Sequence, residues 1–136
     1  MGKATIVPIE MVKASNCKMS NGGNVEDALN YSTTEHVVGK WIDGSTVYEK
    51  TVECGALPNT TSKQVPHNIS NLKNVVEFNG VFSNSTSWFE MNNPNPNNLA
   101  GGVQTAITST SVLIITAANL STYPNSWVTI RYTKTS

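Results

Sequence analysis

The chain has 136 residues, no net formal charge, and charged side chains at only 13% of its positions. This length fits one domain with one core, and the lack of a basic excess excludes the electrostatic footprint of a nucleic-acid-binding protein. Because near-zero charge weakens the repulsion between copies, the composition favours self-association.

The N-terminal stretch, residues 1–30, differs from the rest of the chain. Residues 4–9 are typical of a short strand, residues 20–24 of a flexible turn, and residues 24–29 of one helical turn with Asn24 as its N-cap. A single helical turn is not stable alone. We therefore expect this segment to pack on the main domain or on copies of itself.

The N-terminus also lacks the apolar core of a signal peptide, and no apolar run approaches the ~20 residues of a membrane span. We expect a protein made in the cytoplasm, with no membrane insertion.

From Glu35 onward the pattern is β, with β-branched and aromatic runs separated by turn residues. Such spacing predicts an all-β fold, an antiparallel and jelly-roll-like β-sandwich that follows the N-terminal strand and helical turn. The predicted strands are residues 36–42, 45–53, 63–69, 74–82, 87–91, 102–108, 111–117 and 127–133.

Three connections carry specific predictions. Asp43-Gly44 between apolar flanks predicts a type I′ hairpin turn. Residues 108–111 predict a second hairpin, which leads into residues 112–115, an apolar run expected to be a fully buried central strand. The Asn/Pro tract at 91–98 predicts an exposed loop, because each proline lacks the N–H that a strand ladder requires.

Charge is scarce in the C-terminal third. In the 46 residues after Glu90, the only acidic or basic residues are Arg131 and Lys134. Asn, Ser and Thr supply the remaining polarity, which is typical of strands that alternate Thr outward with Val or Ile inward, or of a surface that faces other subunits.

Few residues suit catalysis or metal binding. The only candidate bases for a triad are His36 and His67, both in predicted strands, where a structural or surface role is expected. Cys17 and Cys54 are interpreted as free thiols, with one disulfide as the alternative, and with the two histidines they do not have zinc-site spacing. We predict no metal site and no cofactor.

Four acidic residues in or beside predicted strands are candidates for the carboxylate pair of a glycoside hydrolase. Their spacing selects no pair, so they are interpreted as charges on outer strand faces and edges. We predict no catalytic residues. The acids concerned are Glu49, Glu53, Glu77 and Glu90.

The aromatic residues are candidates for recognition, since large amphipathic rings serve both carbohydrate and protein binding. Trp41 and Trp127 fall in apolar strands and are expected in the core or in a subunit interface. The residues expected to be exposed and available for contact are Trp88, Phe89, Asn93, Asn95, Asn97 and Tyr123.

Three sequence blocks carry a recognisable pattern. Residues 31–51 follow "YSTxExVVGxWxDGxxxYxKT", residues 57–69 follow "LPNxTxKxVxHxI", and residues 127–135 resemble "YVTLxYTKT". In this order the blocks resemble a C-terminal domain family of tail-fibre, baseplate and head-fibre proteins of tailed bacteriophages and prophages. The resemblance covers residues 31–136. It implies a virion-surface β-sandwich, commonly trimeric, that contacts the host or decorates the particle, with no conserved catalytic residues.

The leading hypothesis is therefore a non-enzymatic virion surface protein, a short head-fibre, tail-fibre or decoration protein. In this hypothesis residues 31–136 form an exposed β-sandwich, assembled as a homotrimer and attached to other virion proteins, which decorates the particle or adheres to a glycan or protein on the host surface. About thirty residues precede the domain, which disfavours a fibre with a long shaft. The residues expected to anchor and trimerise are Ile6, Ile9, Val25, Ala28 and Leu29.

Two alternatives stay open. One is a carbohydrate-binding or carbohydrate-processing module of a gut bacterium, and the other is a purely structural capsid cement protein. The sequence does not distinguish a head location from a tail location.

Overall fold

The computed structural model describes residues 18–19, 25, 30–92 and 102–136. Val25 has a helical conformation, and the strands in these ranges are β1 (His36–Lys40), β2 (Thr46–Glu53), β3 (Ser62–Pro66), β4 (Leu72–Ser83), β5 (Trp88–Glu90), β6 (Val103–Ile107), β7 (Ser111–Thr116) and β8 (Asn125–Lys134). Within this part of the chain, no helix is long and apolar enough to cross a membrane.

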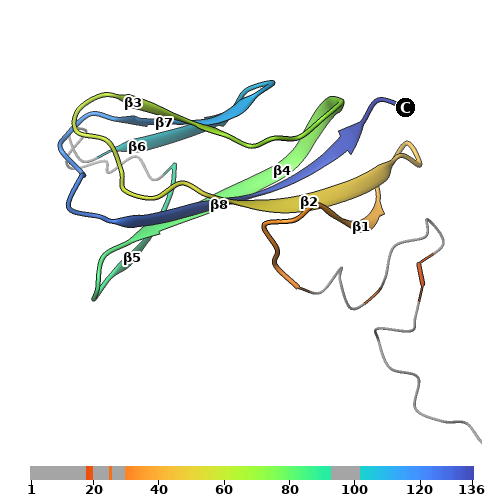
Figure 1. Cartoon of the computed structure of the whole chain (residues 1–136), viewed down its shortest axis with the longest axis horizontal. Helices are drawn as coiled ribbons and strands as arrows, with labels where there is room; N and C mark the ends of the chain where they lie inside the picture. Colours follow the sequence, from red (N-terminus) through yellow and green to blue (C-terminus); the bar gives the residue numbers. More distant parts are fainter. Residues whose placement is uncertain (1–17, 20–24, 26–29, 93–101) are drawn as a thin grey trace, which may run out of the picture.

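The strands form two antiparallel sheets. One has five strands in the order β1-β2-β8-β4-β5, and the other has three in the order β3-β7-β6. Figure 1 shows the sheets as two layers, with β1 and β5 at opposite ends of the larger one, on the side away from the smaller sheet. The predicted all-β antiparallel sandwich is confirmed.

β8 is the central strand of the larger sheet. It pairs with β2 from Tyr48↔Tyr132 to Glu53↔Trp127, and with β4 along most of its length. Because side chains alternate along a strand, every second residue of β8 faces the smaller sheet. Val128, Ile130 and Tyr132 are inaccessible to solvent and belong to the core.

The turn between β1 and β2 differs from the predicted type I′ turn. Gly44 has φ 83°, but Asp43 keeps a negative φ, whereas type I′ needs positive φ at both central residues. The Gly44 N–H donates to the Trp41 carbonyl (2.9 Å) and the Ser45 N–H donates to Asp43 Oδ1 (2.8 Å). The loop is therefore a three-residue type I turn with Gly44 as the bulge residue, and the Asp43 carboxylate holds the turn.

β7 is central in its sheet, as predicted, but it is buried on one side only. Val112 and Ile114 are inaccessible and belong to the core, whereas Ile115 is 40% exposed, because successive side chains of a strand point to opposite sides of the sheet. The predicted hairpin into β7 is confirmed by the Thr108 N–H, which donates to the Ser111 carbonyl at 2.9 Å.

Several predictions fall on residues outside the described ranges. These are the strand at 4–9, most of the helical turn at 24–29 and most of the Asn/Pro tract, and with them Ile6, Ile9, Ala28, Leu29 and Cys17. Val25 is described and half-buried. Cys54 is a buried free thiol, and burial raises its pKa to about 11 against an opposing effect of Lys63.

Candidate functional site

The outer side of the five-stranded sheet carries a row of ionisable residues from four strands. Glu49 pairs in register with His36 on β1 and with Arg131 on β8, and Arg131 pairs with Glu77 on β4. Residues directly opposite each other on antiparallel strands point to the same side. We call this outer side, defined by His36, Glu49, Glu77 and Arg131, the charged face.

Arg131 joins two carboxylates of unequal burial. Its Nε donates to Glu49 Oε2 at 2.7 Å and its Nη1 donates to Glu77 Oε2 at 3.4 Å. The Glu49 side chain is only 4% exposed, whereas that of Glu77 is 56% exposed. The hydrogen bond to Glu49 raises the pKa of Arg131, so the guanidinium stays charged between them.

His36 completes the surroundings of Glu49. Its Nδ1 lies 3.4 Å from the Thr34 carbonyl, and its Nε2 lies 3.6 Å from Glu49 Oε1. Nε2 is buried and has no hydrogen-bond partner within the described residues. The Glu49 carboxylate therefore lies between an arginine and an imidazole, and it is not an unpaired acid.

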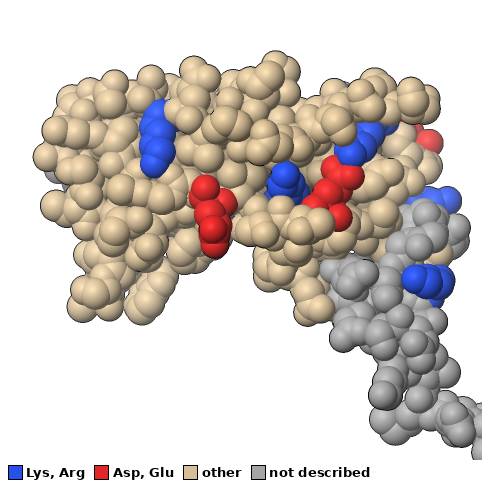
Figure 2. Space-filling model, viewed as in Figure 1, with Lys and Arg blue, Asp and Glu red and all other residues tan. Residues whose placement is uncertain are grey.

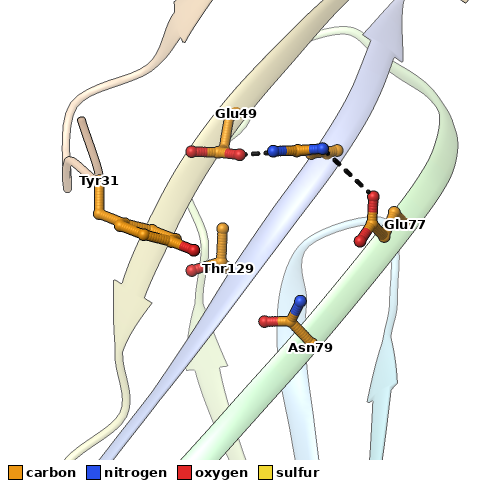
Figure 3. A pocket seen from close by; sticks show the side chains of 6 residues that line it. Tyr31, Glu49, Glu77, Asn79 and Thr129 are labelled. Atoms are coloured by element: carbon orange, nitrogen blue, oxygen red, sulfur yellow. Dashed lines mark hydrogen bonds and ion pairs between the residues drawn. The ribbon is translucent and has the colours of Figure 1, made fainter. Parts of the chain in front are cut away.

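Beside this row lies a polar hollow of about 90 Å³, lined by Tyr31, Glu49, Glu77, Asn79, Thr129 and Arg131. Figure 3 shows Tyr31 and Asn79 on opposite sides of the hollow, with Thr129 between them. Thr129 is fixed by a 2.9 Å hydrogen bond between its hydroxyl and that of Thr51. Tyr31 is 80% exposed, so its ring is presented to solvent.

A second ionic cluster joins the start of the domain to its last strand. Lys134 Nζ donates to Glu35 Oε1 at 2.5 Å, and the Tyr132 hydroxyl donates to Glu35 Oε2. Tyr48 stacks on Tyr132 with ring centres 6.0 Å apart, and Lys134 Nζ lies 5.0 Å from the Tyr48 ring centre. Burial, then the hydrogen bond to Glu35, raises the pKa of Tyr132 well above its ordinary value. This cluster holds strands together.

His67 is a structural residue, as predicted. It is buried, and its Nδ1 accepts a hydrogen bond from the Ile69 N–H at 3.0 Å. Nε2, 3.1 Å from the Thr108 carbonyl, therefore carries the ring proton and donates it. Lys50 Nζ donates to the His67 carbonyl at 2.8 Å.

The aromatic contact candidates separate into three environments. Trp88 is 67% exposed. Phe89 is partly exposed but stacks on Phe82, with ring centres 5.3 Å apart. Tyr123 packs edge-on against both rings and is half-buried, so the expectation that it is an exposed contact residue is wrong; its ring fills the edge of the core. Asn93, Asn95 and Asn97 lie outside the described residues.

The remaining tryptophans, expected in the core or in a subunit interface, are not fully buried in the single chain. Trp41 is exposed over more than a third of its surface, because β1 ends at Lys40 and Trp41 opens the turn. Trp127 is half-buried, and its register opposite Glu53 and Val81 places it on the charged face.

Sequence reasoning missed the row on the charged face, although one signal for it was present. Arg131 and Lys134 are the only acidic or basic residues after Glu90, and each forms an ion pair with a glutamate far away in the sequence. An isolated charge in an otherwise uncharged strand indicates a specific partner.

Within the described ranges, no group of three or more His, Cys, Asp and Glu side chains is placed to hold a metal ion. A scan against protein-family models, a search of curated proteins and a search of solved structures each found no match to this chain.

Proposed function

We propose that this protein is a non-enzymatic surface protein of a tailed-bacteriophage virion, a short head-fibre, tail-fibre or decoration protein. In this proposal residues 1–30 anchor the chain and help it trimerise, and residues 31–136 present a β-sandwich for host adhesion or particle decoration. The observation that carries the proposal is the ordered set of three family-like blocks, together with the places these blocks take in the fold.

Several of the positions that the pattern fixes hold the sandwich together. Glu35 and Tyr48 of the first block contact Tyr132 and Lys134 of the third. Lys50 of the first block contacts the carbonyl of His67 in the second. The three blocks thus describe one packing arrangement, which supports a shared fold with the family they resemble.

The positions that the pattern leaves open include the ionic row. His36, Glu49 and Arg131 all occupy such positions and meet on the charged face. When a sequence pattern specifies packing residues and leaves surface residues unspecified, related proteins can present different contact surfaces on one scaffold. This supports a role in attachment.

The outer side of the three-stranded sheet supports contact with other subunits. Its outward positions carry no charge and include the partly exposed Leu113 and Ile115 on β7. We call it the uncharged face, defined by Ser62, Gln64, Gln104, Ala106, Leu113 and Ile115. Figure 2, which views the two sheets from the side and not onto this face, shows the charged side chains in view as a few separate groups. In the proposal this face contacts a second copy of the chain in the homotrimer.

Location on particles tests the proposal directly. Antibodies against the purified chain should label the head or the tail of phage particles whose genome encodes the chain, in immunogold electron microscopy. Virions that carry no label and no copy of the chain by mass spectrometry would overturn it. Light scattering at micromolar concentration should give three copies of the 14.7 kDa chain, and a clean monomer counts against the trimer.

A glycan-binding or glycan-processing module of a gut bacterium is the second candidate, favoured by two exposed aromatic residues, Tyr31 and Trp88. Incubation of the chain with purified envelope polysaccharide separates the two. Reproducible release of saccharide products would establish processing and refute the non-enzymatic proposal.

A further inference from the structure

We propose that the hollow beside Tyr31 is a binding subsite for the edge of one non-acidic sugar ring. This inference rests on the proposed attachment function and gives it a ligand class and a location. The site is distinct from Trp88, the exposed aromatic residue that the sequence singled out.

The backbone next to the exposed Tyr31 is held in place. The Thr51 N–H donates to the carbonyl of the next residue, Ser32, at 2.8 Å, and the Ser32 hydroxyl accepts a hydrogen bond from the Thr34 N–H at 3.0 Å. These bonds fix the backbone that carries Tyr31 along the edge of β2. An aromatic ring carried by this backbone beside a polar hollow provides a flat surface on which the C–H face of a sugar can pack.

The hollow offers both hydrogen-bond donors and acceptors. Two N–H groups of the Arg131 guanidinium bind Glu49 and Glu77, which leaves three of its five donors. The Asn79 amide lines the hollow (Figure 3) and makes no hydrogen bond to another described residue. Adjacent sugar hydroxyls each donate and accept, so this mixed set matches a diol.

The charge of the hollow selects against acids. Two carboxylates, Glu49 and Glu77, surround one guanidinium, Arg131, which leaves one net negative charge. A sugar carboxylate or sulfate would meet this charge at short range, where like charges repel. A neutral sugar avoids the repulsion, and an amino sugar is attracted.

The dimensions limit the ligand to part of one ring. The volume of about 90 Å³ is well below the ~300–1,000 Å³ of pockets that enclose drug-sized ligands. The almost fully buried Glu49 is held by Arg131 and gives the hollow a fixed floor. A small preformed site of this kind binds weakly as one copy and gains avidity from several copies on one particle.

The test is ligand-observed NMR and calorimetry on the full chain. The probes are the methyl glycosides of glucose, galactose and N-acetylglucosamine, free glucosamine, and, as acidic counterparts, glucuronic acid and N-acetylneuraminic acid. We expect millimolar binding of at least one non-acidic probe and at least tenfold weaker binding of both acids. Tyr31→Ala and Asn79→Ala should each weaken binding about tenfold, whereas Tyr31→Phe should retain it.

Trp88→Ala is the matched control, because it removes another exposed aromatic side chain and should leave probe binding unchanged. Equal or tighter binding of the acids, no binding of any probe, or binding that survives both Tyr31→Ala and Asn79→Ala would overturn the subsite. Host-cell adsorption that persists without probe binding would overturn the subsite alone. Probe binding that depends on Tyr31, in a chain absent from virions, would overturn the virion proposal alone.

Discussion

On both sheets of the sandwich, side chains alternate between the core and the outer side, but the two outer sides carry different kinds of side chain. The charged face carries a row of four ionisable residues and the two most exposed aromatic side chains of the described chain, Tyr31 and Trp88. The uncharged face carries amides, hydroxyls and the aliphatic side chains of Leu113 and Ile115. Both sheets use their inner sides for the core, so the outward positions are free to differ. The difference suggests separate tasks: ligand contact on one side and subunit contact on the other.

Among these predictions, the loss of the partner of the buried Glu49 should have the largest effect on the free energy of unfolding. Arg131→Met leaves the Glu49 carboxylate, 4% exposed, without its main partner, and should lower the free energy of unfolding by about 3 kcal/mol. Glu77→Ala, which removes the solvent-exposed partner of the same arginine, should cost at most about 1 kcal/mol. Urea denaturation measures both, and equal losses would contradict the contrast in burial.

Two neighbouring isoleucines on β7, Ile114 and Ile115, allow the stability contributed by a core side chain to be compared with that of a side chain on the uncharged face. Ile114→Ala removes a fully buried side chain and should cost about 3 kcal/mol. Ile115→Ala removes a partly exposed one and should cost less than about 1 kcal/mol. Chemical denaturation of the two variants at a concentration where each is monomeric provides the measurement. A larger loss for Ile115 would show that its side chain is covered in the isolated chain.

Self-association tests the proposed task of the uncharged face. Ile115→Lys places a charge in the middle of this face and should weaken association at least tenfold, about 1.4 kcal/mol, without unfolding the chain. Trp88→Lys places the same charge at an exposed position near the other face and should leave association unchanged. Sedimentation velocity across a concentration series measures the self-association of both variants. Weaker association of Trp88→Lys, with unchanged association of Ile115→Lys, would assign subunit contact to the charged face.

The smallest expected effect is the pH dependence of stability that arises from Cys54, a residue of the core between the two faces. Its pKa is about 11 in the folded chain and 9.0 as the reference value, so the unfolded thiol ionises first as the pH rises. The stability contributed by the buried thiol is fully present below pH 9 and is lost between pH 9 and 11. In a Cys17→Ser background, Cys54→Ala should therefore flatten the loss of stability between pH 8 and 10.5. An unchanged slope in circular dichroism melts would argue against this burial.

Local sequence was sufficient for the positions of the strands. Residues 111–117 are predicted as a strand and form Ser111–Thr116, because a largely β-branched run that directly follows the turn residues at 108–110 specifies an extended segment within a few residues of chain. Errors arose at strand ends. The third strand was predicted to reach Ile69 but ends at Pro66, since Asn68 adopts a positive φ of 53°. The turn at Asp43 was placed correctly, but a local Asp43–Ser45 hydrogen bond decided its type.

The candidate site depended on pairings that local patterns do not contain. Arg131 meets Glu49 across 82 positions and Glu77 across 54, because β8 inserts between β2 and β4. Which strands become neighbours, and in which register, is set by burial of the whole core and not by any short segment. By itself the sequence determined a charge-poor, all-β sandwich with its strands in place. Only the tertiary structure decided which charges pair, which aromatic rings remain exposed, and that the two outer faces differ.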